Sequence, residues 1–286
     1  MKPVALVTAA AARSLDEDLP PLLRALEAID HPAEAVVWDD PAVDWSRYAM
    51  AIVRSTWDYV PRRDAFVAWA ERVASVTRLA NSPAILRWNT DKRYLRELVA
   101  GGATVVTTHW IEPGDPARVP FDGAFVVKPA ISAGSMDTAR YAPGEMDAAV
   151  AHIRRLQADR RTVMVQPYLS GVDEHGETGM VYLAGEYSHA IRKGAILRPE
   201  VQYVDGLFAK EDLARREPSA AERAAAEKVL DLVPGGREQL LYARVDLAPG
   251  PVLLELELAE PSLFFALSDG AEHRLARAIS AWLRRT

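Results

Sequence analysis

The sequence predicts an α/β protein, with a parallel-sheet domain at the amino terminus followed by a larger module of antiparallel sheets and helices. Over residues 1–85, short apolar runs alternate with amphipathic stretches, a pattern typical of parallel strands joined by helices. Near the carboxyl end, charged and apolar residues alternate with a period of two on both sides of Pro249-Gly250-Pro251, which is typical of an antiparallel hairpin. The two patterns predict different kinds of sheet in the two parts of the chain.

The composition is that of an ordinary globular protein. The 286 residues are 49% hydrophobic, enough for two or three compact units. A formal charge of −6 favours neither nucleic acid nor an anionic membrane surface as a partner. The lack of cysteine excludes disulfides, thiolate metal sites and a cysteine nucleophile, and it agrees with a cytoplasmic location. No apolar run approaches the length of a membrane span, and Pro3 interrupts the short run that could imitate a secretion signal.

The amino-terminal domain is expected to contain strands at 4–7, 35–38 and 50–53, with an amphipathic helix over 15–26 that has acids in its first turn. Ligands bind past the carboxyl ends of the strands in such sheets. The segment after the third strand is therefore a candidate substrate site, and its residues are Arg54, Ser55, Thr56, Trp57 and Asp58.

Arg54 has a planar guanidinium that could clamp a substrate carboxylate. In the alternative interpretation, Trp57 and Tyr59 only pack and Ser55 only forms a turn. The segment alone leaves both possibilities open.

Further elements follow in the second part of the chain. Strands are expected at 125–129, 162–169, 179–183 and 186–193, and helices directly after Lys92, at 219–232 and at 273–285. Ala184-Gly185 provides the turn of the hairpin between the last two strands. Residues 199–217 show no clear pattern and are interpreted as a long functional loop.

The carboxyl-terminal hairpin carries the most informative charges. Alternation places Arg244 and Asp246 on one face of the first strand, and Glu255 and Glu257 on one face of the second. Antiparallel pairing would bring the three carboxylates together beside Arg244, where they would repel one another unless a cation lay among them. A set of oxygen donors without His or Cys suits a hard ion such as Mg²⁺. The alternative is a solvated strand face with ordinary surface acids.

Several separated elements resemble, in order and spacing, those of the ATP-grasp superfamily over about residues 90–286. They are Lys128 at a strand end, the small-residue loop 132–135, the segment 166–169, Arg244 with Asp246, and Glu255-Leu256-Glu257. The resemblance implies an amino-terminal substrate domain over 1–85 and an ATP-grasp module over 86–286. Within that module it implies a lid subdomain over about 119–167 and a carboxy-terminal subdomain over about 168–286.

The resemblance also implies roles for individual residues, with ATP and Mg²⁺, or Mn²⁺ in its place, as cofactors. Those implied to bind the nucleotide are Lys92, Lys128, Ser132, Gly134, Ser135, Gln166, Pro167, Tyr168, Leu169 and Glu174. Glu177 competes with Glu174 for the ribose hydroxyls. Asp246, Glu255 and Glu257 would hold the metal, although many relatives have Asn where Glu257 stands. Arg244 would stabilise the charge on the transferred phosphoryl group.

Within the superfamily, the segments 55–59, 189–193 and 255–257 resemble the glutathione-synthetase-like branch, and most of all the cyclo-ligases of D-cycloserine biosynthesis. This resemblance implies a small amino-acid-like substrate, O-ureido-D-serine. ATP would phosphorylate its carboxylate, its own ureido nitrogen would attack, and the ring would close with loss of CO₂ and NH₃. Arg192 and Lys193 would face the substrate carboxyl or the phosphate. Family habit also implies a homodimer.

Two other functions remain open at this stage. One is an intermolecular ligase of the same fold that joins an amino acid to an amine or peptide. The other is a nucleotide-binding regulator without turnover, which the joint presence of Lys128, Arg244, Asp246, Glu255 and Glu257 disfavours. An oxidoreductase is disfavoured because no glycine-rich phosphate turn follows the first strand. The scattered histidines, His189 among them, are interpreted first as structural.

Overall fold

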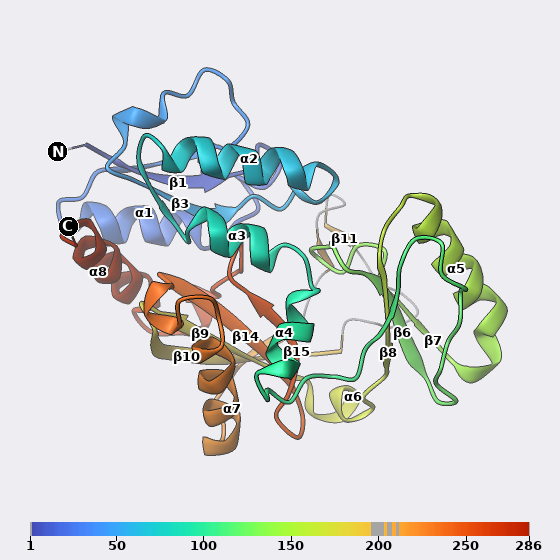
Figure 1. Cartoon of the computed structure of the whole chain (residues 1–286). Coiled ribbons are helices and arrows are strands. Elements are labelled where there is room, and N and C mark those ends of the chain that lie inside the picture. The colour runs from blue at the N-terminus through green and yellow to red at the C-terminus, as the bar shows by residue number, and fades with distance from the viewer. Residues whose placement is uncertain (1, 196–202, 205–207, 210–211, 286) are drawn as a thin grey trace.

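The computed structural model describes residues 2–195, 203–204, 208–209 and 212–285 (Figure 1). In these ranges the chain forms a four-stranded parallel sheet, a four-stranded antiparallel sheet and a five-stranded antiparallel sheet, together with a short two-stranded ribbon. The predicted fold class is confirmed. Within the same ranges, every helix is too short or too polar to span a bilayer.

The amino-terminal sheet has the strand order β2-β1-β3-β4, and all its pairs are parallel. Side chains of β1 alternate between two cores: Leu6 packs in the cluster that contains α1, and Val7 in the cluster that contains α2. The helices therefore cover opposite faces of the sheet. The elements are β1 (Val4–Thr8), α1 (Leu19–Glu27), β2 (Ala33–Val37), β3 (Met50–Ser55), α2 (Arg63–Ala74) and β4 (Arg78–Ala80).

Two short helices, α3 (Pro83–Asn89) and α4 (Tyr94–Ala100), lead to a smaller antiparallel sheet, which we call the lid sheet. Its strand order is β5-β8-β6-β7, and α5 covers one face with a small core of its own. The elements are β5 (His109–Ile111), β6 (Phe125–Pro129), β7 (Ala139–Tyr141), α5 (Met146–Ala158) and β8 (Val163–Pro167).

The five-stranded sheet has the order β13-β10-β9-β14-β15. The predicted hairpin turn at Ala184-Gly185 is present, and both residues have the positive φ that a tight hairpin turn requires. The elements are α6 (Gly171–His175), β9 (Glu177–Leu183), β10 (Glu186–Lys193), β13 (Leu213–Arg216), α7 (Ala220–Asp231), β14 (Tyr242–Ala248), β15 (Val252–Glu257) and α8 (Ala271–Leu283).

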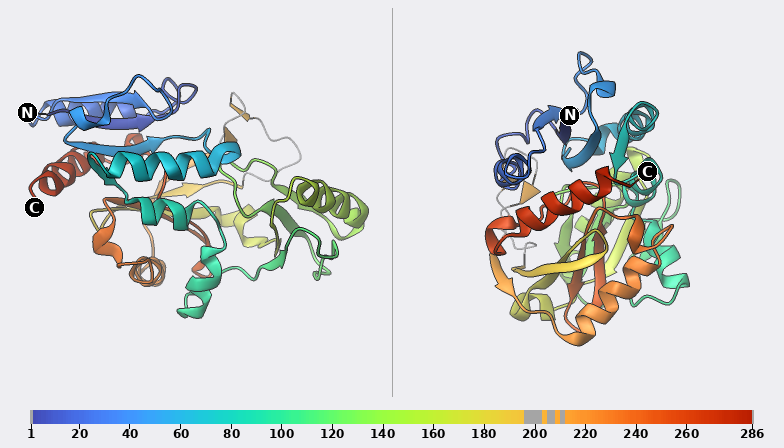
Figure 2. Two further views of the ribbon diagram at one scale, coloured as in Figure 1. Left: turned by 45° about the horizontal axis from the view of Figure 1, so that its top comes forward. Right: turned by 90° about the vertical axis from the view of Figure 1, so that its left-hand side faces the viewer.

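The end of the chain returns to the amino-terminal domain. Helix α8 lies beside α1 (Figures 1 and 2), and both contribute to one core with residues of β1, β9 and β14. The amino-terminal sheet and the five-stranded sheet are thus packed against each other through a common hydrophobic core. This packing brings the segment after β3 close to the segment after β15.

The long loop predicted over 199–217 falls partly outside the described residues. Within it the structure describes β11 (Tyr203–Val204), which pairs with β12 (Phe208–Ala209), and the edge strand β13.

Candidate active site

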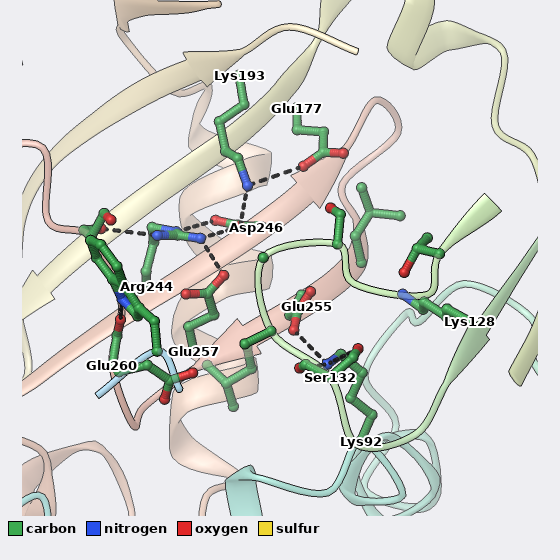
Figure 3. A pocket seen from close by; sticks show the side chains of 18 of the residues that line it. Lys92, Lys128, Ser132, Glu177, Lys193, Arg244, Asp246, Glu255, Glu257 and Glu260 are labelled. Atoms are coloured by element: carbon green, nitrogen blue, oxygen red, sulfur yellow. Dashed lines mark hydrogen bonds and ion pairs between the residues drawn. The ribbon is translucent and has the colours of Figure 1, made fainter. Parts of the chain in front are cut away.

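A cavity of about 560 Å³ lies where the lid sheet, the five-stranded sheet and the amino-terminal domain meet (Figure 3). Strands β6 and β8 contribute Lys128 and Gln166 to its wall, and β10, β14 and β15 contribute charged side chains from the opposite side. The amino-terminal domain contributes Trp57 and Tyr59. All three parts of the fold therefore border one cavity.

The predicted hairpin is confirmed in its register. Asp246 lies opposite Glu255, and Arg244 lies opposite Glu257. Arg244 donates from Nε and Nη2 to the two oxygens of Asp246, at 2.9 and 3.0 Å, and also donates to Glu257. Lys193 Nζ donates to Asp246 Oδ2 at 3.0 Å. Cationic side chains therefore lie among the three carboxylates, as their mutual repulsion requires.

The neighbouring charges lower the pKa of two of the acids and leave the pKa of the third raised. Burial by itself would raise the pKa of Asp246, but Arg244 and Lys193 outweigh it and lower the pKa to about 2. The pKa of Glu255 is also lowered, because the nearby charges of Lys92 and Lys128 outweigh the effect of burial. Burial, with Asp246 and Glu255 nearby, raises the pKa of Glu257 to about 7 in spite of Arg244. Two of the three acids are therefore ionised at neutral pH, and a further cation would ionise the third.

The oxygen donors suit a magnesium ion that arrives with a nucleotide. Within the described residues, no three His or acidic side chains stand close enough to hold a metal ion by themselves. Magnesium usually takes one or two carboxylates and completes its shell with water and substrate phosphates. Asp246, Glu255 and Glu257 all line the cavity and offer only oxygen. The predicted ligands thus line one cavity, and each is paired there with a cationic side chain.

The predicted phosphate-binding residues also meet in the cavity. Lys92 Nζ donates to Ser132 O at 2.6 Å and pairs with Glu255 Oε1 at 3.1 Å, so it connects the small-residue loop to the hairpin. Ser132, Gly134 and Ser135 line the same wall. Burial, reinforced by Lys92, lowers the pKa of Lys128 although Glu255 opposes this. A cation with such a depressed pKa gains from a phosphate partner.

The predicted adenine segment lines the cavity along its whole length, from Gln166 to Leu169. The Tyr168 ring is covered by Arg140 of the lid sheet, whose guanidinium carbon lies 3.6 Å from the ring centroid, and Tyr168 Oη donates to Asp173 at 2.5 Å. Glu174 is a different case: its side chain is 79% exposed and does not line the cavity. Glu177, its competitor for the ribose, does line the cavity. One turn of α6 directs Glu174 to solvent.

The structure separates the two basic residues predicted at the end of β10. Lys193 lines the cavity and lies between Asp246 and Glu177, 3.0 and 3.7 Å from their oxygens. Arg192 points to the other face of the strand, where it donates to His175 O at 3.3 Å. The prediction that Arg192 faces the reacting groups is wrong, because neighbouring residues on a strand point to opposite faces.

Most of the substrate segment predicted after β3 is buried away from the cavity. Arg54 is 1% exposed and its Nη2 donates to the carbonyl of Pro261 at 2.9 Å. Ser55 shares a hydrogen bond with Thr8, and Thr56 is fully buried. Asp58 accepts from Trp38 and pairs with Arg62. Of this segment only Trp57 lines the cavity, so the interpretation of Arg54 as a clamp for substrate carboxylate is wrong.

These residues instead hold the segment that follows β15, which we call the 260–265 loop. Sequence reasoning missed this loop, although Glu260, Ser262 and Phe264 all line the cavity. An acid, a proline and a serine directly after the Glu255-Leu256-Glu257 strand were the available signal. His189, buried and neutral, donates from Nε2 to Leu263 O in the same loop, and burial lowers its pKa to about 4. Its predicted structural role fits this contact.

A lid sheet and a five-stranded sheet that close on lysines and paired carboxylates define the ATP-grasp ligases, and the chain belongs to this class. Within the class it belongs to the DcsG family. It is 39% identical to the cycloserine biosynthesis protein DcsG of Streptomyces lavendulae, over 98% of this chain and 99% of that protein. The family model for the N-terminal domain of D-cycloserine synthetase DcsG matches residues 4–81.

Solved structures agree with this assignment. The crystal structure of D-cycloserine synthetase DcsG matches with a TM-score of 0.89 and 36% identity, over 98% of this chain and 99% of that one. D-alanine–D-alanine ligase from Bacillus anthracis, solved with ATP, has a TM-score of 0.67 at 12% identity over 99% and 97% of the two chains, and supports the fold alone. The chain is an ATP-dependent ligase that forms a C–N bond, with ATP and a divalent metal ion as cofactors.

Proposed function

We propose that this enzyme closes the ring of D-cycloserine from O-ureido-D-serine. The observation that carries the proposal is the 39% identity to DcsG over 98% of the chain, because it includes every segment that lines the cavity. The cavity itself supports it, since nucleotide residues and the 260–265 loop border one space. A substrate that carries its own nucleophile needs no second binding pocket.

The proposed reaction has two steps on the substrate. A carboxylate oxygen attacks the terminal phosphorus of ATP and ADP leaves, which forms an acylphosphate. The ureido nitrogen next to oxygen then attacks the acyl carbon and phosphate leaves, and one water molecule hydrolyses the carbamoyl group to CO₂ and NH₃. Lys92 and Lys128 would neutralise nucleotide phosphates. Arg244 and Lys193 lie where negative charge develops during both attacks.

We further propose Mg²⁺ as the metal, with Mn²⁺ able to take its place, because Asp246, Glu255 and Glu257 offer only hard oxygen donors, which suit both ions. Bound there, the ion would neutralise charge on the phosphates. The remaining nucleotide assignments, from Ser132 to Leu169, belong to the same proposal, with Glu177 in place of Glu174.

The domain division also belongs to the proposal. The shared core of α1 and α8 supports treating residues 1–85 and 86–286 as parts that function together, with the lid at about 119–167 and the carboxy-terminal subdomain at about 168–286. We also propose a homodimer in the cytoplasm, on the base rate of twofold assemblies and the cysteine-free composition.

The proposed function is tested by incubating the full chain with ATP, Mg²⁺ and O-ureido-D-serine and measuring ADP, NH₃ and the ring product. We expect one ADP for each ring formed. ADP release only after an amine or peptide is added would instead establish an intermolecular ligase. Nucleotide binding without any turnover would establish a regulator.

The metal assignment is tested separately with Glu255→Gln, which removes one charge from the hairpin but keeps the side-chain shape. We expect turnover to be lost while the circular dichroism spectrum and melting cooperativity are retained. Asp269→Asn is the matched control, because Asp269 pairs with Arg215 on the exposed surface. Full activity in Glu255→Gln would remove Glu255 from the metal site.

A further inference from the structure

The 260–265 loop is held by side-chain hydrogen bonds to successive carbonyls and then to successive amides of its backbone. The carbonyls of Glu260, Pro261 and Ser262 accept in turn from Trp57 Nε1 at 3.1 Å, from Arg54 Nη2 at 2.9 Å and from Arg244 Nη1 at 2.9 Å. On the other side, the Asp18 carboxylate accepts from the amides of Leu263, Phe264 and Phe265, at 2.6, 3.1 and 2.9 Å.

Most of these restraints come from the amino-terminal domain, in particular from Asp18, Arg54 and Trp57. Arg54 and Asp18 are themselves almost fully buried. A loop whose backbone is fixed in this way presents its side chains to the cavity with little freedom, which is the preorganisation that a binding site needs.

Glu260 is the charged side chain that this loop presents. It lines the cavity and, among the described residues, its carboxylate has no hydrogen bond or ion pair, whereas Asp246, Glu255 and Glu257 each have a cationic partner. Figure 3 shows it beside Glu257 and Arg244, on the side of the phosphoryl-transfer residues. The carboxylate is partly buried, so a positively charged partner would offset its loss of hydration.

We propose that Glu260 binds the ammonium group of an α-amino-acid substrate and thereby selects amino acids over other carboxylic acids. The inference rests on the proposed function, because it assumes that the acid activated in this cavity is an amino acid. The ammonium and the reacting carboxylate of such a substrate are attached to the same carbon. The ammonium acceptor must therefore lie next to Arg244 and the metal acids, and Glu260 lies there.

The test is calorimetry on the full chain with ADP and Mg²⁺, using two probes: O-ureido-D-serine and 3-(ureidooxy)propanoate, which lacks only the amino group. We expect the wild type to bind the first about 30-fold more tightly, the size of a charge-assisted hydrogen bond. Glu260→Gln should lose this preference, and its affinity for ADP should be unchanged. Glu260→Asp should retain most of the preference, and it keeps the test decisive if Glu260→Gln does not fold.

Glu17→Gln is the matched control, because Glu17 is an exposed acid at the rim of the same cavity. It should keep the full preference for the amino group. A preference that persists in Glu260→Gln, or one lost in Glu17→Gln instead, would overturn the inference. So would a wild type that binds both probes equally, or a parallel fall in ADP affinity, which would assign Glu260 to the metal site.

Binding and ring closure are measured independently, so the two proposals can fail separately. If the wild type prefers the amino-bearing probe but forms no ring, the proposed function is wrong and the role of Glu260 is still supported. If the ring forms but Glu260→Gln keeps the preference for the amino group, the proposed function is supported and the role of Glu260 is wrong.

Discussion

Two buried arginines of this enzyme have similar surroundings and opposite tasks. Arg244 projects from β14 toward the cavity, where it bridges Asp246 and Glu257. Arg54, near the end of β3, projects into the interface between the amino-terminal sheet and the loop after β15, where it donates to Pro261 O and lies 3.7 Å from Asp18. Arg244 belongs to the charge system that is proposed to meet the phosphates. Arg54 organises the loop that borders the same cavity.

The two arginines differ in whether a ligand in the cavity could reach the guanidinium. The partners of Arg244 are proposed metal ligands, so a bound metal ion and phosphates would compete for the same charges. Arg54 also lies over the ring of Tyr242, 5.3 Å from its centroid, and is closed off from the cavity by protein. A buried arginine at a strand end can therefore bind a ligand only if part of its guanidinium faces a cavity that the ligand can enter.

The largest expected effect comes from Arg244→Gln. This change removes the cation that is proposed to stabilise both attacks, so kcat should fall by about 10³-fold, as for other arginines that stabilise phosphoryl transfer. Steady-state ADP release measures it. Arg215→Gln, which breaks an exposed pair with Asp269, is the control and should keep full activity. A loss of less than about tenfold would mean that Arg244 only holds the hairpin together.

A smaller effect, on stability, is expected from Arg54→Met. The change leaves Asp16 and Asp18 buried without their nearest cation, so the free energy of unfolding should fall by about 3 kcal/mol. Urea denaturation measures it. Arg47→Met removes an exposed ion pair with Glu34 and should cost less than about 1 kcal/mol. Unchanged stability combined with a lost substrate affinity would restore Arg54 as a substrate clamp.

The smallest effect, and the sharpest contrast with Arg54, is expected from Lys128→Met. Lys128 lines the cavity and has no hydrogen bond or ion pair among the described residues, so its removal should leave stability unchanged or slightly raised. The Kd for ATP should rise about 30-fold through one lost charged contact. Calorimetry and urea denaturation measure the two quantities, with the exposed Lys2→Met as control. A clear loss of stability would give Lys128 a structural role.

Prediction from sequence succeeded where the position of a side chain depends only on the alternation of residues between the two faces of a strand. The period-two pattern of β14 and β15 was sufficient to place Arg244, Asp246, Glu255 and Glu257 on one face, and the register confirms it. It failed where function depends on how separate segments meet. Arg54, Ser55 and Thr56 follow an apolar strand at the expected edge of the sheet, yet a different loop covers them. Nothing local in the sequence indicates which segment will lie across a strand end.

The amino-acid sequence by itself determined the fold class and the charged face of the carboxyl-terminal hairpin, because these depend on periodicity within short segments. The lysines were indicated only by the resemblance to the ATP-grasp superfamily. Only the tertiary structure decided that Glu177 rather than Glu174 lines the cavity, that Arg192 points away, and that the amino-terminal domain acts on the site through the 260–265 loop. The physical reason is burial. A polar side chain takes its role from the groups that surround it after packing, and those groups come from distant parts of the chain.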